Sequence, residues 1–362
     1  MPVKWKKVWI SDETFESAAV FDVNNDGILD IVSGAYWYEG PDFKKKHQIC
    51  TVKSFGEYYD DFSTIPLDVN GDGYKDYITG GWWGRILRWM ENPCGDPSKQ
   101  WQEHIIAEVG NIETTRAWDI DGDGNIEIIP NTPGERKVRI FKLNKRSGDE
   151  KSIFKELVIF EFPEGQRQGH GLGCGDIAGK GCMDIVLSKG WLEAPRNPYD
   201  EEWLWHPEFD FGMASVPILV VDLNEDGKNE IIVGNAHGYG LAWWEKDLKT
   251  KKWVYHPIDP YNAQYHDMQW IDIDGDNKPE LVTGKRHRAH CGNEEGEWDD
   301  VGIYYFKWTG ESFSKQIIDY GPIGIGKGCG IHFAVADLRK TGRMDLIAPG
   351  KDGLYVYFNE GI

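Results

Sequence analysis

The stretch DVNGDGYKDYI, residues 68–78, decides the fold because related segments recur along the whole chain. They are DVNNDGILDIV from Asp22, DIDGDGNIEII from Asp119, DIAGKGCMDIV from Asp176, DLNEDGKNEII from Asp222, DIDGDNKPELV from Asp272 and DLRKTGRMDLI from Asp337. Successive copies begin 46 to 65 residues apart, which leaves room for about four short strands, the size of a propeller blade. Apolar residues flank each loop, so each copy predicts a strand, a turn and a second strand. We therefore predict an all-β fold, a seven-bladed β-propeller.

A second, weaker repeat indicates where each blade begins. A short strand-like run precedes each copy, and the first of these runs is Lys6–Ile10. The last unit ends at LYVYFNEGI, residues 354–362, without an outer strand of its own. We expect the N-terminal strand to complete the last blade beside Leu354–Phe358, because this closure removes open sheet edges. The chain is then a single propeller domain, residues 1–362.

The repeated loops offer oxygen ligands at every second position. The best copies read D-x-[ND]-x-D-G-x-x-[DE], a spacing at which carboxylates and amides converge on a hard cation such as Ca²⁺. Five copies keep the full oxygen set: Asp22, Asn24, Asp26 and Asp30; Asp68, Asn70, Asp72 and Asp76; Asp119, Asp121, Asp123 and Glu127; Asp222, Asn224, Asp226 and Glu230; Asp272, Asp274, Asp276 and Glu280. Two copies are broken, by Ala178 and Lys180 and by Arg339 and Thr341. Asp and Asn also stabilise turns through their own backbone, so a purely structural role stays open.

These loops resemble FG-GAP/VCBS repeats, which occur in integrin α-subunit propellers, and the resemblance covers essentially the whole chain. Three longer strings are similar to the propeller of fungal aldos-2-ulose dehydratase and related sugar lyases, including rhamnose–glucuronate lyases. They are GHGLGCGDIAGKGCMDIVLSKGWLEAP, HDMQWIDIDGDNKPELVTGKRHRAH and GIHFAVADLRKTGRMDLIAPGKDGLYVYF. This resemblance implies a carbohydrate-active enzyme. The fungal dehydratase carries additional domains, so the resemblance does not imply its substrate.

The composition excludes two classes of partner. The formal net charge is −20, so nucleic acids and anionic membranes would be repelled. No stretch approaches the length of apolar residues that a membrane span needs, and the N-terminal sequence lacks the apolar core of a signal peptide. We therefore expect a cytoplasmic protein. The six cysteines show no paired spacing and are expected to be free thiols, and the oligomeric state is left open.

Topology sorts the ten histidines into two groups. Four of them occupy equivalent positions in the outer-strand repeat, and we expect them to be structural: His47, His104, His206 and His256. The other six lead into inner strands or follow second strands: His170, His266, His332, His237, His287 and His290. Loops of these two kinds share one face of a propeller, so we expect these six side chains around the mouth of the central channel.

Other residues on the same face complete the predicted site. The predicted catalytic residues are His170, His266, His332, Tyr265, Lys285 and Arg286. The predicted ligands of a transition metal are His237, His266 and His290, because imidazoles with a carboxylate suit Zn²⁺ or Mn²⁺, and Mg²⁺ is a further candidate. The predicted substrate-binding residues are Asp61, Glu113, Trp82, Arg85, Lys189 and Tyr239.

Aromatic faces beside carboxylates and cations predict a carbohydrate site. We expect a carbon–oxygen lyase or dehydratase that acts on a small keto- or uronic sugar by β-elimination. A neutral His or Tyr would be the base, and a metal, Lys or Arg would stabilise the enediolate. Two alternatives stay open. One is a lectin-like or scaffold propeller without chemistry, and the other is a glycoside hydrolase that uses carboxylates such as Asp61 and Glu113.

Overall fold

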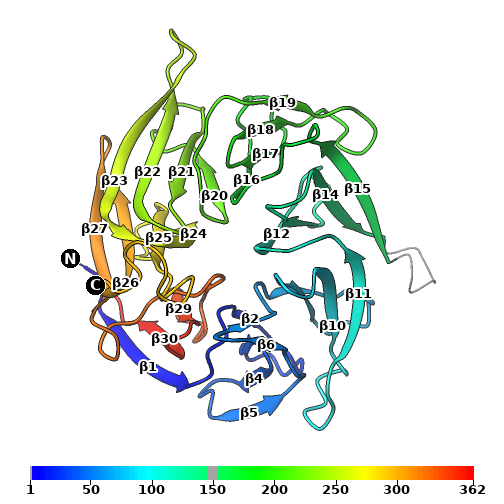
Figure 1. The fold of residues 1–362 in the computed structure, drawn as a ribbon. Coiled ribbons are helices and arrows are strands. Elements are labelled where there is room, and N and C mark those ends of the chain that lie inside the picture. The colour runs from blue at the N-terminus through cyan, green and yellow to red at the C-terminus, as the bar shows by residue number, and fades with distance from the viewer. Residues whose placement is uncertain (1, 145–152) are drawn as a thin grey trace.

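The computed structural model describes residues 2–144 and 153–362, and in these residues the protein is all-β, without a helix. Its sheets are arranged around a common axis as a β-propeller (Figure 1). The described residues contain no apolar helix of the length that crosses a membrane. The fold class expected from the repeats is therefore confirmed at this level.

Five antiparallel sheets have four strands each in the described chain. They comprise β2 (Ala19–Phe21), β3 (Asp30–Ser33), β4 (Tyr36–Glu39) and β5 (Lys45–Gln48); β8 (Ile65–Leu67), β9 (Asp76–Gly80), β10 (Ile86–Glu91) and β11 (Gln102–Glu108); β12 (Thr114–Trp118), β13 (Glu127–Asn131), β14 (Lys137–Leu143) and β15 (Phe154–Glu161); β24 (Tyr265–Ile271), β25 (Glu280–Lys285), β26 (Val301–Trp308) and β27 (Phe313–Gly321); and β28 (Ala334–Ala336), β29 (Asp345–Ala348), β30 (Leu354–Asn359) and β1 (Trp5–Ser11). A two-stranded hairpin, β6 (Ser54–Phe55) and β7 (Tyr58–Tyr59), lies between the first two of these groups in the chain.

The segments expected to form blades four and five make one continuous eight-stranded sheet. Its order is β19 (Leu204–His206), β18 (Gly190–Glu193), β17 (Asp184–Leu187), β16 (Leu172–Gly175), β20 (Ile218–Val221), β21 (Glu230–Gly234), β22 (Tyr239–Lys246) and β23 (Trp253–Ala263). The inner strands β16 and β20 pair in parallel, with Gly173 opposite Ile218. Glycine permits this approach, since a Cβ at Gly173 would lie 2.3 Å from the Ile218 carbonyl oxygen.

The first strand of the chain lies in the same sheet as the last three. Strand β1 pairs antiparallel with β30, and Lys6 is opposite Phe358 in this register. Figure 1 shows the two ends of the chain close together beside this sheet.

The apolar core consists of seven clusters in the described chain, and each cluster draws on two consecutive groups of four strands. One cluster joins Ile140 of β14 to Leu187 of β17. Another joins Ile31 of β3 to Val356 of β30, so the first and last groups pack on each other as the others do. The alternating apolar residues of the strands therefore bury themselves between neighbouring groups and leave polar residues for the axis and the loops.

The repeated aspartates hold the loops through backbone amides. Asp22 accepts hydrogen bonds from the amides of Asp26 and Gly27, at 3.1 and 2.7 Å. In the broken loop at Asp176 the first aspartate accepts from Lys180 and Gly181 in the same way, at 2.9 and 2.7 Å. Because intact and broken loops share this contact, the first aspartate stabilises the turn whether or not an ion is present.

Two of the intact loops contain a lysine among their carboxylates. Lys142 Nζ lies 2.8 Å from Asp123 Oδ2 and 3.2 Å from Glu127 Oε1, and it also pairs with Asp121. Lys307 makes the corresponding contacts in the loop that begins at Asp272: 2.8 Å to Asp276, 3.5 Å to Glu280, and a further pair with Asp274. In these two loops the ammonium group pairs with the carboxylates for which the sequence alone suggested Ca²⁺.

The four outer-strand histidines have a common packing role. Each packs on a tryptophan of the neighbouring strand with ring centroids 4.0 to 4.5 Å apart: His47 is tilted against Trp37, and the other three rings are stacked, His104 on Trp89, His206 on Trp191 and His256 on Trp243. Each Nε2 also bonds a glutamate of that strand: Glu39, Glu91, Glu193 and Glu245. These contacts explain the repeat of histidines without any role in binding.

Candidate functional site

Equivalent positions in three units bring polar side chains to the axis. Glu113 precedes β12, His170 precedes β16, and His266 lies at the start of β24. Each stands six residues before the first aspartate of its loop. Because the units repeat the same geometry, these side chains meet in the middle of the ring. His237 joins them from the turn between β21 and β22.

The four side chains form one compact cluster of potential metal ligands. Their nearest nitrogen and oxygen atoms all lie within 4.8 Å of one another. Glu113 Oε1 is 3.0 Å from His266 Nε2 and 3.3 Å from His170 Nε2. The Nε2 atoms of His170 and His237 are 3.0 Å apart. We refer to Glu113, His170, His237 and His266 as the central cluster.

Hydrogen bonds orient two of these imidazoles. Nδ1 of His170 lies 2.6 Å from the carbonyl oxygen of Ala214, which can only accept, so Nδ1 is the donor. Nδ1 of His237 lies 3.0 Å from Glu294 Oε2 and donates to that carboxylate. In their neutral forms both rings therefore carry the lone pair on Nε2, and the two lone pairs face each other. A positive charge, either an extra proton or a metal ion, is needed between them.

Burial shapes the charges of the central cluster. It lowers the pKa of His266 well below its usual range and also lowers the pKa of His237, so both rings are neutral near pH 7. Burial alone would raise the pKa of Glu113, but the adjacent His170 and His266 hold it well below its usual range. The cluster therefore contains two neutral imidazoles, those of His237 and His266, and one carboxylate, the protonation states in which these groups bind metals.

The spacing suits a transition metal. Zn²⁺ binds nitrogen at about 2.0–2.1 Å, so the ligand atoms of a tetrahedral site stand about 3.3 Å apart. The separations of 3.0, 3.0 and 3.3 Å in the central cluster are close to this value. A proton can bridge one pair of atoms, whereas a metal ion would satisfy all four.

A cavity of about 360 Å³ lies directly against the central cluster. Aromatic side chains form one wall: Tyr58, Phe62, Trp82 and Trp83. Trp83 stacks on Phe55 with ring centroids 4.8 Å apart, which fixes the hairpin of β6 and β7 against the wall. His170, His237 and Glu113 line the cavity from the cluster side.

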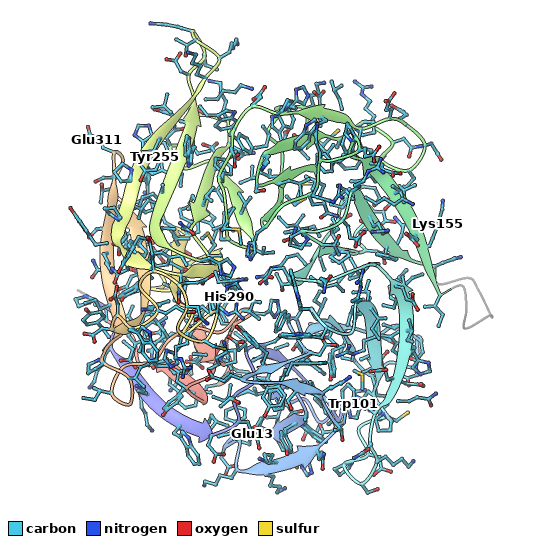
Figure 2. The ribbon with its side chains drawn as sticks, viewed as in Figure 1. Glu13, Trp101, Lys155, Tyr255, His290 and Glu311 are labelled. Atoms are coloured by element: carbon cyan, nitrogen blue, oxygen red, sulfur yellow. The ribbon has the colours of Figure 1, made fainter. Side chains whose placement is uncertain are left out.

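Loop 286–300, between β25 and β26, covers part of the site. Its residue His290 lines the cavity, and Figure 2 shows it near the middle of the ring. The His290 ring stacks on His237 at 4.4 Å, and its Nδ1 bonds the same Glu294 carboxylate that receives His237. Lys285 anchors the loop by donating to the carbonyl oxygens of Gly296 and Asp299.

The structure brings together much of the histidine set that the sequence predicted. His170, His237 and His266 meet in the central cluster, and His290 stacks against it. Glu113, expected to contact substrate, instead lies at the centre of the cluster. Arg286 lies beside it, with Nη1 3.8 Å from Glu113 Oε1.

Three predicted catalytic residues lie elsewhere. His332 is buried with Nδ1 3.5 Å from Ser17 Oγ, and the groups gathered in the central cluster do not include it. Tyr265 packs in the core between two sheets and donates to Asp259, 2.8 Å away. Lys285 anchors loop 286–300, as described above.

The predicted substrate-binding residues divide similarly. Trp82 and Glu113 line the cavity. Asp61 is buried and accepts a hydrogen bond from Thr79. The other three residues are not part of the cavity lining. Arg85 pairs loosely with Glu135 at 3.7 Å, and Lys189 lies 4.0 Å from Asp210. Tyr239 donates to Asp299.

Two residues of the site, Glu294 and Glu16, were not predicted from the sequence. Glu294 orients both His237 and His290, yet it lies in an acidic stretch, NEEGE, that reads as a solvated loop. Glu16 pairs with Arg286 from the opposite end of the chain. Its position in the repeat could have predicted Glu16, because it stands six residues before the loop aspartate Asp22, as the axial residues of the other units do before theirs.

The fold and the site define a β-propeller with a buried histidine–carboxylate centre. The FG-GAP-like repeat family matches residues 222–283 of the chain. A search of curated protein sequences gave no significant match.

Several solved structures share the fold at low sequence identity. A lectin of Agrocybe aegerita that recognises non-reducing terminal N-acetylglucosamine is 13% identical, with a TM-score of 0.50 over 87% of this chain and 80% of the lectin. BBS1N in complex with ARL6DN is 11% identical, with a TM-score of 0.53 over 99% of this chain and 98% of BBS1N. The rhamnogalacturonan lyase YesW is 12% identical, with a TM-score of 0.48 over 100% of this chain and 75% of YesW. For the lectin and BBS1N, the similarity at these identities concerns the fold alone.

Proposed function

We propose that this chain is a metal-dependent carbon–oxygen lyase that acts on a small sugar derivative in the central cavity. The observation that carries the proposal is the pair of Nε2 atoms of His170 and His237, 3.0 Å apart, whose rings both donate through Nδ1. This arrangement needs a cation, and the cavity beside it is lined by aromatic rings on which sugar C–H groups can pack. The resemblance of three sequence strings to sugar lyases agrees with this proposal.

The ligand types favour particular metals. Three imidazoles with one carboxylate suit Zn²⁺ or Mn²⁺, whereas Mg²⁺ prefers an oxygen shell. The bound metal would polarise a carbonyl or carboxylate oxygen of the sugar and so make the neighbouring C–H bond more acidic. The residues of this chain would then hold the sugar against the aromatic wall and move the proton.

His290 is the side chain best suited to accept that proton. It lines the cavity and is about half exposed, and its Nδ1 is bonded to Glu294, so Nε2 carries the free lone pair. In the elimination, the C–H proton would pass to His290, and the C–H electrons would form a carbon–carbon double bond as the C–O bond on the next carbon breaks. The leaving hydroxide would take this proton from His290 and depart as water. Tyr265 and His332, buried away from the cavity, no longer enter this scheme.

The test is turnover by the metal-loaded chain. The purified protein, loaded with Zn²⁺ or Mn²⁺, is incubated with a panel of keto-sugars and sugar acids, and the conjugated product is followed in the ultraviolet. We expect turnover that disappears in His266→Ala together with the metal, and that persists in His256→Ala, which changes a packing histidine. Bound sugar without a conjugated product from any member of the panel would contradict the proposal.

A second candidate is sugar binding without chemistry, and the aromatic wall favours it. Trp82 and Trp83 would serve a lectin-like propeller equally well, and such a protein needs no base. The two candidates differ in the metal: binding that survives removal of the transition metal, with calcium as the remaining ion, favours the lectin-like function.

We also propose that the scaffold is a closed ring of seven blades. The eight-stranded sheet would then be two blades joined by the parallel pairing of β16 and β20. Seven apolar clusters, one for each pair of neighbouring groups including the first with the last, support this count. Structural Ca²⁺, where present, is proposed for the loops that begin at Asp22, Asp68 and Asp222, since Lys142 and Lys307 supply a positive charge in the other two intact loops.

A further inference from the structure

Arg286 is a buried arginine whose guanidinium is only partly paired. Its side chain is 2% exposed. Nε donates to Glu16 Oε1 at 2.9 Å and Nη2 donates to Glu16 Oε2 at 3.1 Å, which is the bidentate geometry of a strong arginine–carboxylate pair. This pair fixes the plane of the guanidinium and leaves Nη1 on the side away from Glu16.

Nη1 points to the cavity and the central cluster. Arg286 is one of the residues that line the cavity, and Nη1 lies 3.8 Å from Glu113 Oε1, beyond hydrogen-bond distance. Within the described residues, the side-chain hydrogen bonds of Arg286 use Nε and Nη2 alone. The two N–H donors of Nη1 therefore face the cavity without a protein acceptor among the described residues, and they are available to an acceptor on a ligand.

Two carboxylates and two cations surround this end of the cavity, although the whole chain carries −20. Glu16 is shared by a second buried cation, because Lys351 Nζ lies 3.8 Å from Glu16 Oε2. The second carboxylate is Glu113, whose Oε1 lies 3.8 Å from Arg286 Nη1. These four charges balance, and the metal ion proposed for the central cluster would make the surroundings of Nη1 positive, so an anionic group that enters the cavity would be attracted there.

We propose that Nη1 of Arg286 is the binding subsite for an anionic oxygen group of the substrate, so that the sugar is a sugar acid or a sugar phosphate. This inference rests on the proposed function, which gives a sugar as the substrate, and it assigns that sugar a negative charge. The rigid pairing with Glu16 makes Arg286 a specificity-determining residue, since the donors are held in place before the ligand arrives.

The experiment measures binding rather than turnover. The full chain, loaded with Zn²⁺, is titrated calorimetrically with glucuronate, glucuronamide, glucose and glucose 6-phosphate. We expect glucuronate or glucose 6-phosphate to bind at least about tenfold more tightly than the neutral sugars, because a charged hydrogen-bonded pair is worth more than a neutral one. Preference for glucuronate assigns a sugar acid, and preference for the phosphate assigns a sugar phosphate. Equal binding of all four would overturn the inference.

A variant separates Arg286 from the metal as the source of any preference. Glu16→Gln combined with Arg286→Gln removes both charges of the pair and avoids an unpaired buried carboxylate. We expect this variant to keep its metal and to lose the preference for anions, while Arg196→Gln, an exposed arginine, keeps both. A preference that survives in the double variant would overturn the inference. Should that variant not fold, Arg286→Lys replaces it, and it is expected to reduce the preference at least about threefold because the fork is lost.

The outcomes are separable from those of the proposed function. Tight binding of a sugar acid without elimination would retain the anion subsite and remove the lyase. Elimination from neutral sugars alone would retain the lyase and remove the subsite.

Discussion

The Nε2 atoms of His170 and His237 lie 3.0 Å apart in the middle of the propeller. Neither neutral imidazole has a proton on Nε2 to donate to the other, because each donates through Nδ1. Ala214 accepts from one Nδ1 and Glu294 accepts from the other. Two nitrogen lone pairs held in this way repel each other unless a cation lies between them. With Glu113 and His266 at similar separations, the arrangement matches a metal site more closely than a packing contact.

Replacing His237 by Ala should remove the metal. The variant loses one of four ligands and also frees Glu294, so we expect metal content to fall from about one per chain to near zero in elemental analysis after dialysis. His206→Ala is the matched control, because it removes a stacked and hydrogen-bonded histidine of the scaffold. This control should unfold at a lower temperature but keep its metal. Equal metal content in the two variants would contradict the assignment.

Replacing Glu294 by Gln should weaken metal binding without abolishing it. Glu294 orients His237 and increases its basicity, and loss of such a partner typically lowers metal affinity by about 10- to 100-fold. The affinity is measured by competition with a chelator of known strength. Glu295→Gln changes an exposed neighbour and should leave the affinity unchanged. A Glu294→Gln variant with unaltered affinity would show that the carboxylate does not support the site.

The repeats and most of the histidine set could be predicted from the sequence. The residues placed wrongly are those for which the exact position in the strand decides which side the side chain faces. Tyr265 and His266 are neighbours, yet His266 reaches Glu113 while Tyr265 packs in the core, because successive side chains of a strand point to opposite sides. His332 stands five residues before Asp337, whereas His170 stands six before Asp176. That one-residue difference turns His332 away from the central cluster.

Other features depended on contacts that no local pattern encodes. The pairing of Glu16 with Arg286 joins segments from opposite ends of the chain, and the merging of two expected blades depends on the close approach of β16 and β20 at Gly173. The lysines inside two Asp loops come from the third strands, about 20 to 30 residues later in the chain, so the loop motif by itself reads as a calcium site.

Replacing Lys142 or Lys307 by Met should make stability depend on calcium. Each change leaves three carboxylates without their cation, and we expect the free energy of unfolding in EDTA to fall by about 1–2 kcal/mol, since these lysines are partly exposed. Added Ca²⁺ should restore more of this loss than Mg²⁺ does, as seen in thermal unfolding. Lys278→Met is the control, because Lys278 is an exposed residue of the loop that begins at Asp272. Variants that lose stability without any recovery in Ca²⁺ would contradict the idea that lysine replaces an ion.

Stability should fall as the pH rises through about 6, partly because of Asp61. Burial raises the pKa of Asp61 to about 6, above the value of about 3.9 for an unfolded aspartate. The folded state therefore binds the proton more tightly, and the stabilisation is complete below about pH 4 and lost as the pH rises through 6. Asp61→Asn imitates the protonated acid. We therefore expect the free energy of unfolding of this variant to exceed that of the original chain by about 1–3 kcal/mol at pH 8 and by little at pH 4.

The measurement is denaturant unfolding at both pH values. Asp210→Asn, at an exposed aspartate, should show no such difference between them. An Asp61→Asn variant that is less stable than the original chain at pH 8 would indicate that Asp61 is held as a stabilising carboxylate instead.

The central claim is that Glu113, His170, His237 and His266 bind one transition metal ion, and anomalous X-ray diffraction tests it most directly. Crystals of the full chain are grown with Zn²⁺ or Mn²⁺ and measured on both sides of the absorption edge of the metal. We expect one strong anomalous peak among these four side chains, at about 2.0–2.2 Å from each ligand atom. Crystals that hold no metal at this position, with the His170 and His237 rings hydrogen-bonded through a shared proton, would contradict it.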